Sequence, residues 1–151
     1  MAAEYLANAQ QSVSLNAPVI FTASIPCTKG YIYHEDETGI FILRGIVNNP
    51  CANFATYRVT FNANIALPTG GTVAPIAVAI TTNGEQRPTS KAVFTPAAAV
   101  DFGNVTCTAI IKVPRGCCFN LSIENVAANT TDTPAPVIVV ENANLVVDRI
   151  A

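Results

Sequence analysis

Residues 101–125 place the strongest constraint on the fold of this chain, because apolar and polar side chains alternate there with a period of two. One face of an extended strand through the first half receives only apolar or small side chains: Val105, Cys107, Ala109, Ile111 and Val113. Pro114-Arg115-Gly116 suits a turn, since proline fixes φ and glycine allows a positive φ. The alternation then resumes through Cys117, Phe119, Leu121 and Ile123. We therefore expect an antiparallel hairpin whose apolar face is covered by a second sheet.

The same pattern recurs along the rest of the chain. A long segment places on one face Ala55, Tyr57, Val59, Phe61, Ala63 and Ile65. Shorter strands are expected at 19–23, 31–34, 40–43, 73–80, 91–95, 137–140 and 145–150, with turns at Asn83-Gly84 and Asn142. About ten strands, spaced roughly 8–12 residues apart and without a convincing helix, predict an all-β, ten-stranded antiparallel jelly-roll sandwich.

The chain is poor in charge for its length. Charged residues make up 12% of its 151 residues, against about 25% in an ordinary domain. Segments 73–80 and 145–150 are apolar on both faces, although one face of a sandwich sheet normally meets water. A neighbouring subunit would supply the missing cover, so we expect a homotrimer with the interface residues Val78, Ile80, Leu145, Val146 and Val147.

The overall charge and hydropathy exclude two classes of partner. The net charge is −2 and no basic patch is evident, which argues against nucleic acid. No apolar run approaches the roughly 20 residues of a membrane helix, so membrane insertion is not expected.

Residues 1–16 lack a strong pattern, and we expect them to form an arm in front of a jelly-roll domain at 17–151. The apolar points in this arm are Tyr5, Leu6, Val13 and Leu15, which are candidates for attachment to a larger particle. No basic region followed by an apolar stretch occurs after Met1, so we expect synthesis in the cytoplasm without a signal peptide.

Residues with catalytic or metal-binding chemistry are few. The single histidine, His34, precedes Glu35, Asp36 and Glu37, which are weak candidates for a cation and better explained as a solvated turn. No catalytic or phosphate-binding motif occurs, so neither an enzyme nor a cofactor is expected. The five cysteines are expected to be mainly buried, reduced thiols: Cys27, Cys51, Cys107, Cys117 and Cys118. A Cys27–Cys51 disulfide remains open.

Several runs together resemble the trimeric jelly roll of the tumour necrosis factor and complement globular-head superfamily. They are Tyr57-Arg58-Val59-Thr60-Phe61, Ile76-Ala77-Val78-Ala79-Ile80 with Asn83-Gly84, Arg115-Gly116, and Asn144-Leu145-Val146-Val147. The runs ALPTGGTV, VPRGCCFN and VENANLVVDRIA are also similar to small bacteriophage virion proteins of the head-fibre or capsid-decoration kind. They resemble the C-terminal domains of collagen-like spore-surface glycoproteins as well, but this chain has no Gly-X-Y stalk.

Two functional hypotheses follow. The resemblance implies a structural virion protein, a homotrimer on the virion surface whose arm contacts a capsid or another virion protein. The alternative is an adhesin or receptor-binding module that recognises a cell-surface glycan or protein through its apical loops.

Overall fold

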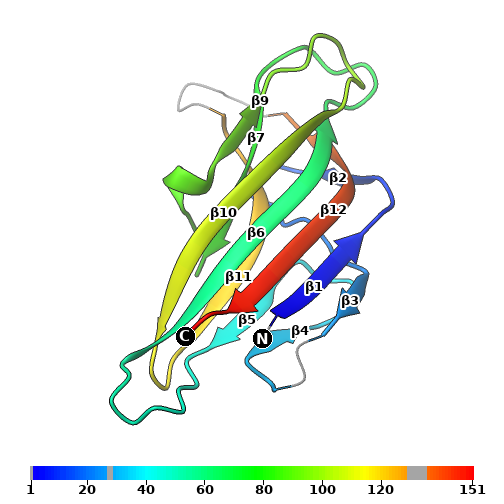
Figure 1. Ribbon diagram of the computed structural model, residues 1–151. Coiled ribbons are helices and arrows are strands. Elements are labelled where there is room, and N and C mark those ends of the chain that lie inside the picture. The colour runs from blue at the N-terminus through cyan, green and yellow to red at the C-terminus, as the bar shows by residue number, and fades with distance from the viewer. Residues whose placement is uncertain (1, 27–28, 129–135) are drawn as a thin grey trace.

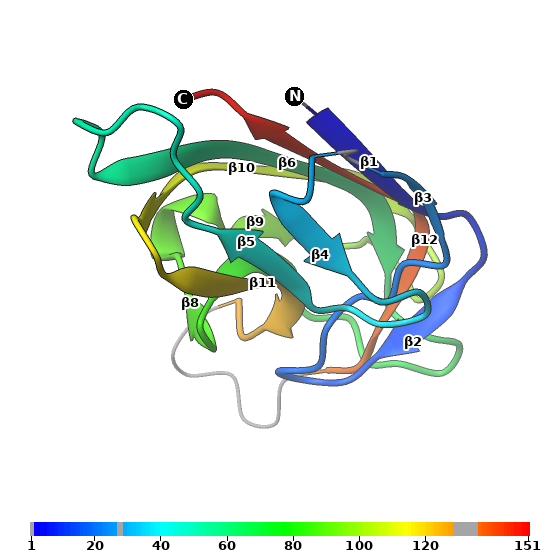
Figure 2. The ribbon, with the colours of Figure 1, turned by 90° about the horizontal axis from the view of Figure 1, so that it is seen from below.

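The computed structural model describes residues 2–26, 29–128 and 136–151. The chain forms two antiparallel sheets that lie face to face, as the view along the layers shows (Figure 2). Sheet A has the order β10-β6-β12-β1-β3, and β2 pairs with β12 (Figure 1). Its strands are β1 (Ala2–Ala7), β2 (Gln11–Val13), β3 (Ala23–Ile25), β6 (Phe54–Ala66), β10 (Gly103–Pro114) and β12 (Ile138–Arg149).

Sheet B has the order β4-β5-β11-β7-β8, with β9 pairing with β7. Its strands are β4 (Ile32–His34), β5 (Phe41–Arg44), β7 (Ile76–Thr82), β8 (Glu85–Gln86), β9 (Ala92–Phe94) and β11 (Cys118–Val126). A single turn of 3-10 helix, η1 (Pro88–Ser90), links β8 to β9. Within the described parts of the chain, no helix is long and apolar enough to cross a membrane.

The predicted alternation is confirmed in β6 and β10 of sheet A. All the inward side chains predicted for β6 are buried, and those of β10 are buried except Ala109, which is half-buried. They meet the inward side of sheet B in one core, whose largest fully buried side chains are Tyr57, Phe21, Phe41, Phe61, Leu43 and Ile65. Each such side chain contributes about 1.5–3 kcal/mol by leaving water.

The expected hairpin at 101–125 is wrong in its pairing, although its turn is correct. Cys117 N–H donates to Pro114 O at 2.9 Å and Gly116 has φ +79°, but β10 belongs to sheet A and β11 to sheet B. The chain at Gly45 separates the two strands. Gly45 N–H donates to Cys117 O at 2.8 Å, and Gly45 O accepts from Gly116 N–H at 3.0 Å. The turn is therefore a corner between layers.

The expected turn at Asn142 is also wrong. Residues 138–149 form one continuous strand, and its register against β6 shifts by one residue between Glu141 and Asn144. Asn142 has φ +56° at this point. A bulge absorbs the extra residue and bends the strand without ending it. The described residues form twelve strands rather than the expected ten, because the short strands β1, β2 and β8 were not predicted.

The separation of an arm at residues 1–16 does not correspond to the structure. Strand β1 pairs with both β12 and β3, and β2 pairs with β12. Tyr5 and Val13 are each 2% exposed, which removes them from any attachment surface. The Tyr5 ring lies 4.5 Å from Phe41 and 4.9 Å from His34, between centroids. Strands β1 and β2 are therefore part of sheet A, and their inward side chains are part of the core.

Four of the five expected interface residues lie inside the single chain. Val78, Ile80, Leu145 and Val147 are fully buried between the sheets, and only Val146 faces outward. On the other side of β7, Ala77 and Ala79 pack against Val126 and Ala128. The Lys91 ammonium spans this patch, donating to Ala127 O at 3.4 Å and Ala128 O at 3.3 Å. The chain thus covers both faces of β7 itself.

The burial of β1 predicts different effects for two neighbouring residues. Tyr5→Ala should lower the free energy of unfolding by about 3–5 kcal/mol, because it leaves a cavity beside Phe41. Leu6→Ala, on the outward side of the same strand, should cost about 1 kcal/mol or less. Urea unfolding at one protein concentration measures both. A chain beginning at Ala17 should fail to fold. A truncated chain that folds, or equal costs of the two substitutions in the full chain, would contradict this role of β1.

Burial also predicts slow chemistry at Cys107. Desolvation raises the pKa of this thiol from 9.0 to about 11, so the thiol stays protonated at pH 8. The buried side chain is also inaccessible to a reagent in the folded state. A variant that keeps only Cys107 should react with a thiol reagent after denaturation but barely in the native state. A matched variant that keeps only the exposed Cys118 should react at once. Equal native rates would refute the assignment.

The same pKa shift predicts lower stability at alkaline pH. Because the folded pKa lies above the unfolded value, the fold holds this proton more tightly, and its contribution disappears as pH rises from 9.0 through about 11. Cys107→Ala should flatten the fall in unfolding free energy across that window. If the free energy of unfolding falls equally in the variant and the parent, other titrating groups cause the loss of stability.

Candidate functional site

The outward side chains of β10, β6, β12 and β1 form a broad surface, which we call the sheet A face (Figure 1). The register of the four strands arranges these side chains in rows. The central rows are Thr106–Asn62–Asn144–Leu6, Thr108–Thr60–Val146–Glu4 and Ile110–Arg58–Asp148–Ala2. Threonine and asparagine occupy five of these twelve positions, and Val146 lies near the centre of the face.

A line of asparagine amides crosses this face from β10 to the β1–β2 loop. Asn104 Nδ2 donates to Asn62 Oδ1 at 2.7 Å and to Asn64 Oδ1 at 3.2 Å. Asn64 Nδ2 donates to Asn142 Oδ1 at 3.2 Å, and Asn142 Nδ2 donates to Asn8 Oδ1 at 2.6 Å. The bulge at Asn142 brings its amide into this line. The amides connect four segments without adding any charge.

The charged groups on this face already have partners within the chain. Arg58 Nη2 lies 2.9 Å from Asp148 Oδ2, and Glu4 Oε1 accepts from Asn144 Nδ2 at 2.7 Å. The Lys112 ammonium lies 6.0 Å from the centroid of the Phe54 ring. The face can therefore approach another surface without isolating a charge from its partner.

Strand β10 forms one edge of sheet A. It is 12 residues long, and in sheet A it pairs with β6 alone. Ile110 is 48% exposed on this edge strand, and Arg87 Nη2 donates to its carbonyl oxygen at 3.3 Å. Edge strands leave N–H and C=O groups available for pairing with another chain.

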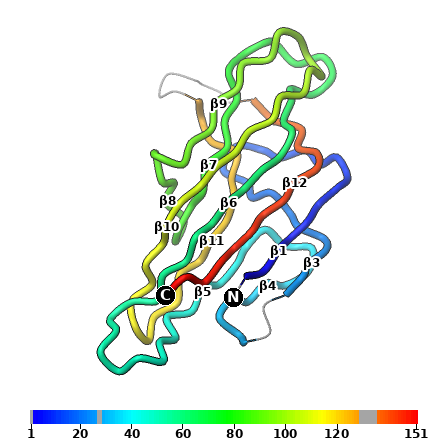
Figure 3. The backbone as a smooth tube through the Cα atoms, viewed as in Figure 1, coloured from blue at the N-terminus to red at the C-terminus, as the bar shows by residue number. Residues whose placement is uncertain are grey.

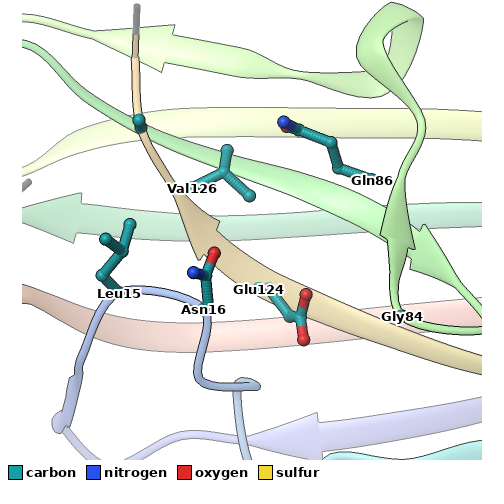
Figure 4. Close-up of a pocket in the computed structure, with 7 residues that line it drawn as sticks. Leu15, Asn16, Gly84, Gln86, Glu124 and Val126 are labelled. Carbon is teal, nitrogen blue, oxygen red and sulfur yellow. The ribbon is translucent and has the colours of Figure 1, made fainter. Parts of the chain in front are cut away.

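The outer side of sheet B carries three adjoining hollows, which together we call the sheet B groove. The first, of about 280 Å³, has Glu124 and Val126 of β11 between Leu15–Asn16 and Gly84–Gln86 (Figure 4). The second, of about 350 Å³, shares Gly84 and Glu124 with the first. The third, of about 240 Å³, shares Ile40 with the second and ends at Tyr33.

Glu124 lies where the first two hollows meet. Burial raises the pKa of its carboxyl, and a hydrogen bond with Thr81 partly offsets this effect. Thr81 Oγ1 in turn bonds the Ser122 hydroxyl. The cross-strand register of β7 and β11 pairs Thr81 with Ser122 and so produces this cluster.

The acidic run at Glu35, Asp36 and Glu37 forms the turn between β4 and β5. Thr38 Oγ1 donates to Glu35 O at 2.7 Å, and Glu37 has φ +64°. Among the described residues, no group of three or more His, Cys, Asp or Glu side chains could hold a metal ion. The ring of His34 stacks on Phe41 with centroids 4.2 Å apart, which explains this histidine by packing.

The remaining candidates from the sequence are scattered. Of the four attachment residues, Leu6 is half-buried on the sheet A face and Leu15 is 40% exposed beside the sheet B groove. Among the described thiols, Cys51, Cys117 and Cys118 are free and exposed, contrary to the expectation of burial, whereas Cys107 is free and buried as expected. Cys27, and with it the Cys27–Cys51 pair, lies outside the described residues.

Sequence reasoning missed both the asparagine line and the cluster around Glu124. Alternation did place Ser122 and Glu124 outward on one strand. It could not join them to Thr81, which lies 41 residues before Ser122, because only the strand register does so. The asparagines likewise come from four separate segments.

Comparisons with known proteins found similarity in structure. No protein-family model matches the chain, and no curated protein matches it. The globular domain of the zebrafish complement 1qA protein matches with a TM-score of 0.62 at 14% identity, over 99% of this chain and 97% of that one. The Eiger TNF from S. frugiperda matches with a TM-score of 0.61 at 13% identity, over 100% and 92%.

Murine APRIL at pH 5.0 matches with a TM-score of 0.55 at 9% identity, over 99% of this chain and 98% of that one. At such low identity these matches establish the fold alone. This chain has the jelly-roll fold of the complement 1q globular domain and tumour necrosis factor, as the sequence resemblance implied.

Proposed function

We propose that this chain is a non-enzymatic structural protein that assembles as a homotrimer through the sheet A face and the free edge of β10. The observation that carries the proposal is the long β10 edge beside a broad face whose charges are already paired. A closed ring of copies covers such an edge in every subunit, because each copy places its edge against the face of the next.

The physical case rests on the cost of leaving this edge uncovered. A 12-residue edge strand with an exposed Ile110 is a template for open-ended strand pairing. Threonine and asparagine side chains can be covered at modest cost, provided that they form hydrogen bonds across the interface. Val146, among the residues expected at the interface, supplies an apolar contact near the centre of the face.

We further propose that the trimer sits on the surface of a virion, made in a bacterial cytoplasm, as a head-fibre or capsid-decoration protein. The support is the resemblance of the ALPTGGTV, VPRGCCFN and VENANLVVDRIA runs to such proteins. Both chain ends lie at one end of sheet A, since Ala2 is opposite Asp148 (Figure 3). Three copies held together would attach through several weak contacts at once, which strengthens binding.

The homotrimer predicts a particle of about three times the 15.8 kDa chain mass in light scattering at micromolar concentration. Val146→Asp should give folded monomers, because it buries an unpaired charge at the interface. Val93→Asp is the matched control: Val93 is 52% exposed on β9 of sheet B and should leave the trimer intact. A monomeric parent, or a trimeric Val146→Asp variant, would refute this interface.

The virion role predicts that the chain copurifies with particles on a density gradient and is identified in them by mass spectrometry. Leu15→Asp, next to the sheet B groove, tests whether this side of the chain contacts the particle, and it should reduce copurification. Val93→Asp is its control and should copurify as the parent does. Particles without the chain, from cells that contain abundant free trimer, would exclude the virion role and leave the trimer proposal standing.

A further inference from the structure

The sheet B groove combines the groups that recognise neutral sugars. Its middle is lined by the carboxylate of Glu124, the hydroxyl of Ser122 and the amides of Asn83 and Asn120. The Thr81 hydroxyl is buried and forms a hydrogen bond with the Ser122 hydroxyl. A carboxylate accepts from sugar hydroxyls, while amides and hydroxyls both donate and accept. Asn83 Oδ1 accepts from Asn120 N–H at 2.9 Å, which holds the Asn83 amide at the rim.

Apolar side chains lie on both sides of these polar groups along the groove. Ile40 is 53% exposed where the second and third hollows meet, and Leu15 is 40% exposed at the opposite end. Tyr33 is 57% exposed and lines the third hollow. Aliphatic and aromatic surface of this kind suits the C–H faces of a pyranose ring, while the polar groups fix its orientation.

The charge of the groove favours a neutral ligand over an acidic one. Neither lysine nor arginine is among the described residues that line the three hollows. Glu124 in the middle of the groove and Glu35 in the third hollow supply carboxylates, so phosphate, sulfate or uronic acid groups would be repelled. With no basic counter-charge, the strongest available interactions are hydrogen bonds from ligand hydroxyls to carboxylate oxygens.

We propose that the sheet B groove binds a neutral oligosaccharide of about three sugar units, one in each hollow, with Glu124 as the central acceptor. The alternative expected from the sequence placed glycan recognition in apical loops, whereas this site lies on the outer side of a sheet. It does not rest on the trimer proposal, because the sheet A face is on the opposite side of the sandwich (Figure 2). Assembly through sheet A would leave three such grooves facing outward.

The test uses the full chain labelled with ¹⁵N and three neutral trisaccharides as probes: maltotriose, cellotriose and chitotriose. Each is titrated into the millimolar range, where a shallow site of this kind is expected to saturate. At least one trisaccharide should shift the backbone amide signals of residues 15–17, 40–42, 83–86 and 120–126. The signals of Thr106 and Thr108 on the sheet A face should stay unchanged.

Three variants assign the binding to named side chains. Glu124→Gln keeps the shape of the side chain and should lower the affinity about tenfold, the loss of about one charge-assisted hydrogen bond. Tyr33→Ala should weaken the trisaccharide but leave the matching monosaccharide unaffected, because its ring serves only the terminal unit. Thr108→Ala, on the sheet A face, is the control and should bind as the parent does.

The outcomes separate this proposal from the trimer proposal. No shift of the groove signals with any of the three trisaccharides, or equal affinity of a folded Glu124→Gln variant and its parent, would overturn the sugar site. A monomeric chain that binds sugar would overturn the trimer and leave the groove assigned. An acidic sugar that binds more tightly than its neutral counterpart would contradict the charge argument.

Discussion

The corner at Gly45 decides how the two layers of this molecule are connected. A side-chain Cβ at Gly45 would lie 2.0 Å from Pro114 O, so only glycine fits between the 114–117 turn and the neighbouring strand. Beside it, the Tyr57 hydroxyl donates to Tyr31 O at 3.1 Å and Arg44 O at 2.5 Å. These contacts hold β10 in one sheet and β11 in the other, and the two apolar faces close on each other as a result. The core and both outer surfaces depend on that separation.

Closing the two apolar faces leaves two outer surfaces with different shapes. Sheet A has long, regular strands, and its outer face is broad and rich in threonine and asparagine. Its charged side chains Arg58, Asp148 and Glu4 have partners within the chain. Sheet B keeps shorter strands that are overlain by the segment at Leu15 and by the Asn83-Gly84 turn, so its outer side is grooved. Because these surfaces lie on opposite sides of the sandwich, the proposed assembly through one would not compete with the proposed ligand binding at the other.

Alternation predicted much of the fold and little of the candidate sites. It assigned Val105, Cys107, Ile111 and Val113 to one buried face, and the structure confirms this assignment. It failed at β1, where the inward residues are Ala3, Tyr5 and Ala7, because alanines give little contrast in hydropathy from which to recognise a strand. The groove and the asparagine line could not be predicted in this way, since each joins side chains that only strand register brings together.

The sequence by itself determined the fold class and the side chains that share a strand face, because successive Cβ atoms point to opposite sides of any strand whatever its partner. Only the tertiary structure decided which strands are neighbours, that β10 and β11 lie in different sheets, and that β1 and β2 contribute to the core. The physical reason is that backbone hydrogen bonds carry no residue identity: a strand can pair with several others equally well. The choice among partners falls to long-range packing, here around Tyr57 and the close approach at Gly45.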